Sequence, residues 1–151
     1  MNERDHGNRR VAQLPAQVFP AGSPASGGPP PPVAAGQARA MVREVLDDHY
    51  GSRGGEPVGS EAGDALLVTS ELVTNAFTHG EGLTAFSAHV VDGELMLQVT
   101  DRSPLPPHVK EGERGQPGGF GWGLAGRLCR TLYVRPLPDG GGKTIVACLP
   151  L

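Results

Sequence analysis

Residues 61–80 read EAGDALLVTSELVTNAFTHG, and this stretch decides the fold class of the chain. Its apolar residues recur at the three- and four-residue spacing of an amphipathic helix, which we expect over Glu61–His79. Ser60 stands where an N-cap residue belongs, and Gly80 stands where helices commonly end. The sequence on either side of this helix must therefore supply the elements against which its apolar arc packs.

The flanking sequence predicts two further helices and four strands. Alternating residues on both sides of Asp92-Gly93 indicate a hairpin with a type I′ turn. The expected elements are helices over Ala34–Tyr50 and Trp122–Arg130, and strands over Leu83–Val91, Glu94–Asp101, Leu132–Arg135 and Lys143–Leu149. This order is typical of an α+β two-layer sandwich with three helices on one face of a mixed, mostly antiparallel sheet.

The first 33 residues differ in composition from the rest of the chain. They end in the Gly- and Pro-rich tract PAGSPASGGPPPP, which lacks the amide donors and apolar side chains needed for packing. We expect a flexible arm over residues 1–33 and one domain over residues 34–151. Within the arm, Gln13–Phe19 alternates weakly and could add an edge strand.

Composition excludes several classes of protein. The chain has 151 residues and a net charge of −3, so it lacks the excess of Lys and Arg that nucleic-acid binding requires. No apolar run reaches the ~18 residues of a membrane span, and no signal peptide is visible. Two cysteines and five scattered histidines match no zinc or metalloenzyme spacing. We expect a cytoplasmic protein that binds a small molecule or another protein.

A polar row borders the apolar arc of the 61–79 helix. With Glu71 at zero, Asn75 falls at about 40° and His79 at about 80° around the helix axis. The arc that we expect to be buried contains Ala65, Leu66, Thr69, Leu72, Val73, Ala76 and Phe77. Such a row is most often a solvated face. A carboxylate and a carboxamide one turn apart can also present a base and a metal ligand to one small space.

Three further features could carry chemistry. Residues 115–125 are rich in glycine and run into a predicted helix, an arrangement that suits an anion but equally suits a flexible loop. Asp101 ends a strand, where it is either a turn former or an acceptor for an exocyclic amine. Thr144 lies on the last strand beside a Gly-rich turn, where the ordinary interpretation is a strand threonine.

Taken together, these segments resemble the motifs of the Bergerat-fold ATPases, the superfamily of gyrase B and the histidine kinases. The four segments are ELVTNAFTH (71–79), VTDRS (99–103), GFGWGLA (119–125) and GGKT (141–144). The wording of the first is most similar to the anti-sigma serine kinases, particularly the small ATP-binding regulators of actinobacteria. The resemblance covers about residues 34–151.

The resemblance implies a site for ATP and Mg²⁺. Asn75 matches the asparagine that coordinates Mg²⁺, and Glu71 matches the acidic residue proposed as the general base. Asp101 matches the aspartate that reads the adenine amine, and Thr144 matches the threonine that supports this contact. The other nucleotide-binding positions that it implies are Ser103, Gly119, Gly121, Gly123 and Leu124. For His79, the simplest interpretation is a partner of the helix dipole.

The chain departs from the superfamily pattern in two places. The adenine motif DxGxG is replaced by Asp101-Arg-Ser103-Pro-Leu105, without either glycine. Trp122 stands where a small aliphatic residue is usual. It could lie over the nucleotide or fill the core, and we expect it to fill the core. In the loop before it, Lys110 and Arg114 could approach phosphates.

The expected function is that of an anti-sigma-type switch. Such a protein binds Mg·ATP, sequesters a sigma factor or a similar partner, and phosphorylates a serine or threonine of an antagonist protein, commonly as a homodimer. The alternative is a non-catalytic module in which ATP only orders an interaction surface. A domain that has lost the nucleotide stays open as a third interpretation.

Overall fold

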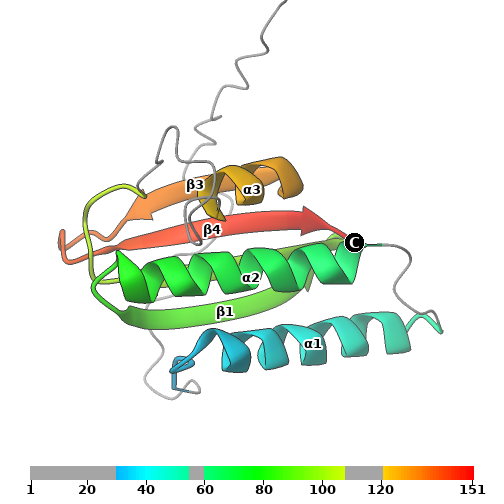
Figure 1. Cartoon of the computed structure of the whole chain (residues 1–151). Helices are drawn as coiled ribbons and strands as arrows, with labels where there is room; N and C mark the ends of the chain where they lie inside the picture. Colours follow the sequence, from blue (N-terminus) through cyan, green and yellow to red (C-terminus); the bar gives the residue numbers. More distant parts are fainter. Residues whose placement is uncertain (1–29, 55–59, 108–120) are drawn as a thin grey trace, which may run out of the picture.

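The computed structural model describes residues 30–54, 60–107 and 121–151, and in these ranges every expected helix and strand is present close to its predicted bounds (Figure 1). The elements are α1 (Ala35–Gly51), α2 (Glu61–Thr78), β1 (Leu83–Val91), β2 (Glu94–Asp101), α3 (Gly121–Leu128), β3 (Thr131–Pro136) and β4 (Lys143–Pro150). Gln13–Phe19, Lys110, Arg114 and Gly119 lie outside the described residues.

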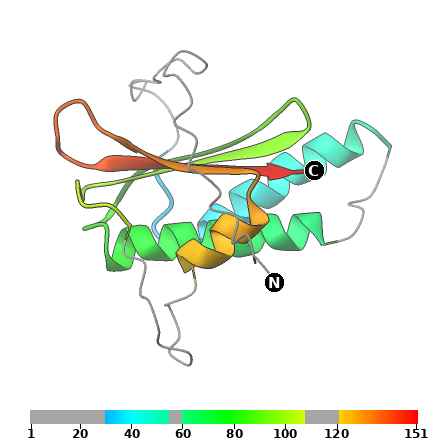
Figure 2. The same cartoon turned by 90° about the horizontal axis from the view of Figure 1, so that it is seen from above.

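The four described strands form one sheet in the order β1-β2-β4-β3. All three pairings are antiparallel, so the expectation of a mixed sheet is wrong for this part of the chain. Two hairpins, β1–β2 and β3–β4, join through β2 and β4, and this arrangement needs no parallel pair. Figure 2 shows all three helices on one face of the sheet, which confirms the two-layer α+β architecture.

The first hairpin turns at the predicted dipeptide. Asp92 and Gly93 have φ values of 52° and 77°, so both central residues occupy the left-handed region that a type I′ turn requires. Its register runs from Val91↔Glu94 to Leu83↔Asp101, with one irregularity between Leu83 and Ala85. This register brings the end of β2 beside the start of β1.

Helix α2 covers the sheet with most of the predicted arc, but Val68 is buried as well, Leu66 is only partly buried and Phe77 is exposed. Its buried residues are Ala65, Val68, Thr69, Leu72, Val73 and Ala76. Phe77 is 42% exposed, because it lies at the margin of the arc beyond the reach of the sheet, and its expected burial is wrong.

Ser60 stands at the N-cap position of α2, as expected, but the side-chain cap is missing. Its φ and ψ of −87° and −1° are helical rather than extended, so its side chain caps no backbone amide. Its hydroxyl instead donates to the carboxylate of Asp64, with Oγ–Oδ2 at 3.4 Å.

Among the described helices, none combines the length and the apolar character that crossing a bilayer requires.

Candidate functional site

Asp101 ends β2 in a buried ion pair with the first residue of β4. Lys143 Nζ lies 3.0 Å from Oδ1 and 2.9 Å from Oδ2 of Asp101, and it also donates to the carbonyl of Ser103 at 3.1 Å. Asp101 is 2% exposed and Lys143 is 4% exposed. The two residues are directly paired in the β2–β4 register. The aspartate expected to accept from adenine therefore already has a cationic partner.

The chain around Asp101 is built to hold its carboxylate. The backbone N–H of Ser103 donates to Oδ1 at 3.0 Å, so the residue two positions on closes a turn over the carboxylate. Burial raises the pKa of Asp101 above that of an ordinary carboxyl, while the ion pair with Lys143 and the Ser103 N–H oppose the rise. The nearby charge of Glu81 adds to it.

Gly80 allows the end of α2 to rest on this carboxylate. A Cβ at position 80 would lie 2.6 Å from Cγ of Asp101 and 2.7 Å from the carbonyl oxygen of Ala76, closer than real side chains approach. The Arg102 N–H also donates to the carbonyl of Gly80 at 2.9 Å, which ties the end of β2 to the end of the helix. Gly80 is thus required for close approach, and its φ is not in the left-handed region.

Thr144 lies on the other face of the sheet. Its Oγ1 is 2.8 Å from Oγ1 of Thr100, its paired residue on β2. Because successive strand residues point to opposite faces, Thr100 and Thr144 point away from the helices while Asp101 and Lys143 point toward them. The structure therefore does not bring Thr144 to Asp101, and Lys143 takes that place.

Glu71 and Asn75 lie on the flank of α2 that faces α3. Helix α2 lies between α1 and α3 in the helical layer (Figure 1), and Arg39 of α1 donates to Ser70 on the near flank, with Nη1–Oγ at 3.0 Å. Asn75 lies about 140° around the helix from Ser70, so it leaves on the opposite flank. Glu71 lies one turn earlier in the same row, and both side chains are half-buried.

The residues of α3 divide between core and surface. Trp122 is partly buried and packs on the main core, which confirms its expected role in filling the core. Gly123 is exposed, a Cβ added there would meet no neighbouring residue within 4 Å, and Leu124 is half-buried. Gly121 begins the helix. The row formed by Glu71 and Asn75 thus faces the helix that the glycine-rich segment enters.

His79 follows this row at the end of α2. It is the C-cap residue, and its N–H donates to the carbonyl of Asn75 at 2.8 Å. Its side chain is exposed. The C-terminal position agrees with a partner of the helix dipole.

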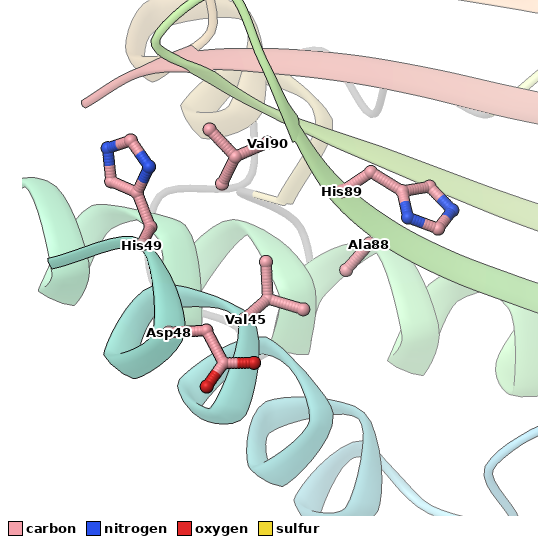
Figure 3. Close-up of a pocket in the computed structure, with 6 residues that line it drawn as sticks. All are labelled: Val45, Asp48, His49, Ala88, His89 and Val90. Carbon is pink, nitrogen blue, oxygen red and sulfur yellow. The ribbon is translucent and has the colours of Figure 1, made fainter. Parts of the chain in front are cut away.

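A shallow groove of about 340 Å³ lies elsewhere, between the last turns of α1 and the edge strand β1. Its lining residues are Val45, Asp48, His49, Ala88, His89 and Val90. Figure 3 shows the two imidazoles at opposite ends of the groove, pointing away from one another. The two imidazoles do not converge on a common point, so they could not act together on one ligand in this groove.

Lys143 was not predicted as a site residue, although the sequence contains a signal that its side chain is buried. The strand residues Ile145, Ala147 and Leu149 all belong to the main core. Lys143 has the same parity, so the period-two pattern by itself directs its side chain to that core. A lysine directed to a core needs a buried carboxylate partner, and Asp101 was the one acidic residue that closed a predicted strand.

Comparison with known proteins adds no relative. The chain matches no protein-family model, and no curated protein matches it.

Proposed function

We propose that this chain is a cytoplasmic regulator that binds Mg·ATP along the α3-facing flank of α2, near the end of the sheet that carries Asp101. The observation that supports this most directly is that Glu71 and Asn75 lie on the same flank of α2. They are a half-buried carboxylate and carboxamide, one turn apart, and they point toward the helix that the glycine-rich segment enters. The histidine-kinase-like fold is part of the same proposal.

The donor set suits a magnesium–phosphate group better than a free metal ion. In the described ranges no three His, Cys, Asp or Glu side chains converge as a metal site. Mg²⁺ is usually held by one or two protein oxygens together with phosphates and water, and the Asn75 side chain can supply one such oxygen. Bound Mg²⁺ would neutralise phosphate charge at this flank.

The base-binding end suits the nucleotide less well. Both carboxylate oxygens of Asp101 accept from Lys143, and Oδ1 also accepts from Ser103. A carboxylate can accept more than these three bonds, but Asp101 is buried under Gly80. Adenine would therefore contact Asp101 only after this end of α2 moves.

In the proposed reaction, Glu71 acts as the base toward a serine or threonine of an antagonist protein. The hydroxyl oxygen forms a bond to the γ-phosphorus while the bond from that phosphorus to the β,γ-bridging oxygen breaks. The hydroxyl proton passes to Glu71, and ADP leaves. Phosphoryl transfer depends mainly on positioning and electrostatics, to which Glu71 would contribute a carboxylate and Asn75 a ligand for Mg²⁺. The proposed partners are a sigma factor and its antagonist, and the proposed assembly is a homodimer.

A calorimetric titration with Mg·ATP tests the site. We expect micromolar affinity, about −8 kcal/mol, that Asn75→Ala abolishes. Thr74→Ala is the matched control, because Thr74 is exposed and lies on the same helix next to Asn75. Equal loss in both variants, or none in Asn75→Ala, would contradict the assignment.

The base is tested by transfer of labelled γ-phosphate to an antagonist protein. Glu71→Gln should abolish transfer and leave nucleotide binding intact.

A second candidate function is a non-catalytic ATP-dependent interaction module. It is favoured by the fact that Asp101 is already paired, and tight binding without any transfer would select it.

A further inference from the structure

The face of the sheet turned away from the helices, here called the outer face, is uncharged at its centre. Its central residues are Met96, Gln98, Tyr133, Val146 and Cys148. Val146 pairs directly with Gln98 on one side and with Tyr133 on the other, so these side chains form one continuous surface. Its charged residues, Glu94 and Arg135, stand at the margins.

The centre of the outer face is buried to the degree of a protein core. Val146 is 2% exposed and Cys148 is 9% exposed, and they form a hydrophobic cluster with Met96 that is separate from the main core. Every described helix packs on the opposite face (Figure 2). Burial this deep, on a face of the sheet that no described helix covers, points to another segment lying over the cluster.

The chain that precedes α1 passes close to this face. Figure 2 shows the blue segment before α1 running from the start of the helix to the level of the sheet. Pro32, which belongs to this segment, is buried. Helix α1 itself packs beside β1, the edge strand of the sheet. The described chain therefore begins beside one edge of the outer face.

The preceding residues have the length and the composition to cover it. Residues 11–19, VAQLPAQVF, are uncharged and carry Val11, Leu14, Val18 and Phe19, whereas residues 20–30 contain only Pro, Gly, Ala and Ser. The eleven peptide units from Phe19 to Pro30 span up to about 36–40 Å. Four strands spaced about 4.8 Å apart are only about 14 Å across. The apolar stretch can thus reach any part of the outer face.

We propose that residues 11–19 of the same chain dock on the outer face and cover the cluster formed by Met96, Val146 and Cys148. The uncharged stretch meets the uncharged centre of the face, and the Gly- and Pro-rich residues that follow act as the tether. The N-terminal arm thereby becomes a cover for the second face of the sheet.

The thiol of Cys148 reports on this contact in the full-length chain. The test is the rate at which N-ethylmaleimide alkylates Cys148, with mass spectrometry to distinguish Cys148 from Cys129. The double substitution Leu14→Asp/Phe19→Asp should accelerate alkylation of Cys148 by about tenfold or more, the factor that corresponds to about 1.4 kcal/mol of docking free energy. Ser23→Asp/Ser26→Asp places the same charges in the tether and should leave the rate unchanged.

Cys129 provides the control for folding. It belongs to the main core on the helix face, and burial raises its pKa to about 12, so it should stay unreactive in every variant. An unchanged Cys148 rate in Leu14→Asp/Phe19→Asp overturns the proposal. So does protection of Cys148 that rises with protein concentration, because a second copy would then cover the face.

Discussion

Two neighbouring residue pairs of the β2–β4 ladder are Asp101–Lys143 and Thr100–Thr144. They show how strongly a step of one position along a strand changes the environment of a side chain. Asp101, Lys143 and Thr144 are buried and Thr100 is partly buried. Each pair is joined by a side-chain hydrogen bond. The first pair faces the helices and is ionic, and the second faces away from them and is neutral. A buried charge must be compensated, whereas a buried hydroxyl needs only one partner.

This difference has a consequence for the site. The ion pair lies beneath the end of α2, so it fixes where the helix ends relative to the sheet, and through Ser103 it also fixes the chain that leaves β2. The threonine pair holds only two strands together. We therefore expect changes to the two pairs to differ in size, and changes at the helix end to behave like changes to the ion pair.

The largest effect is expected for Lys143→Met. It leaves the Asp101 carboxylate buried without its cation, which typically costs about 3–5 kcal/mol of unfolding free energy. Urea denaturation measures the loss. The double variant Asp101→Leu/Lys143→Met should recover most of it, because replacing both charges with apolar groups is often neutral. Equal losses in the single and double variants would show that the ion pair itself does not matter.

The pH dependence of this loss gives a second measurement on the same variant. Because the pKa of Asp101 is raised, the folded protein binds this proton more tightly than the unfolded chain does. The carboxyl therefore favours folding at low pH, and that contribution is lost as pH rises through its folded pKa. Without Lys143 the pKa rises further, so the destabilisation by Lys143→Met should shrink from about pH 7 to about pH 4.

Gly80→Ala should have an intermediate effect. The new methyl group overlaps the Asp101 carboxylate and forces the end of α2 away from β2, at a typical cost of about 1–3 kcal/mol. Gly126→Ala is the matched control, because that glycine lies in α3 with no other residue within 4 Å of the added methyl. The control should be neutral or stabilising, since alanine favours a helix. Similar losses at the two positions would contradict the close contact at Gly80.

The smallest effect is expected for Thr144→Val on the outer face. The substitution keeps the shape of the side chain and removes one neutral hydrogen bond to Thr100, which typically costs about 0.5–1.5 kcal/mol. Thermal denaturation measures it, and Thr100→Val/Thr144→Val should be closer to the wild type than the single variant. A loss as large as that of Lys143→Met would mean that the two faces do not differ in the way described.

Local patterns were sufficient to predict the secondary structure. The spacing of apolar residues predicted α2, and the Asp92-Gly93 dipeptide predicted the first hairpin, because both depend on residues close in the chain. Phe77 is exposed where burial was predicted, and Ser60 occupies the predicted N-cap position without a side-chain capping hydrogen bond. The edge of a buried arc and the backbone geometry of a helix start depend on what packs beside them.

The candidate site was only partly predictable in the same way. Helical periodicity placed Glu71 and Asn75 in one row, and the structure adds that this row faces α3 rather than α1. The pairing of Asp101 with Lys143 joins residues that are 42 positions apart in the chain. No local pattern encodes that distance, although the parity of β4 already directed Lys143 to the core.

The sequence by itself determined the elements, their order and which side of each element is apolar, because helical and strand periodicity are properties of short segments. Only the tertiary structure decided the strand order β1-β2-β4-β3, and with it the residues that meet at the end of the sheet. The register between β2 and β4 sets Asp101 opposite Lys143 and Thr100 opposite Thr144. A shift of one residue would exchange the faces of these side chains, and burial of the apolar face selects the register that is observed.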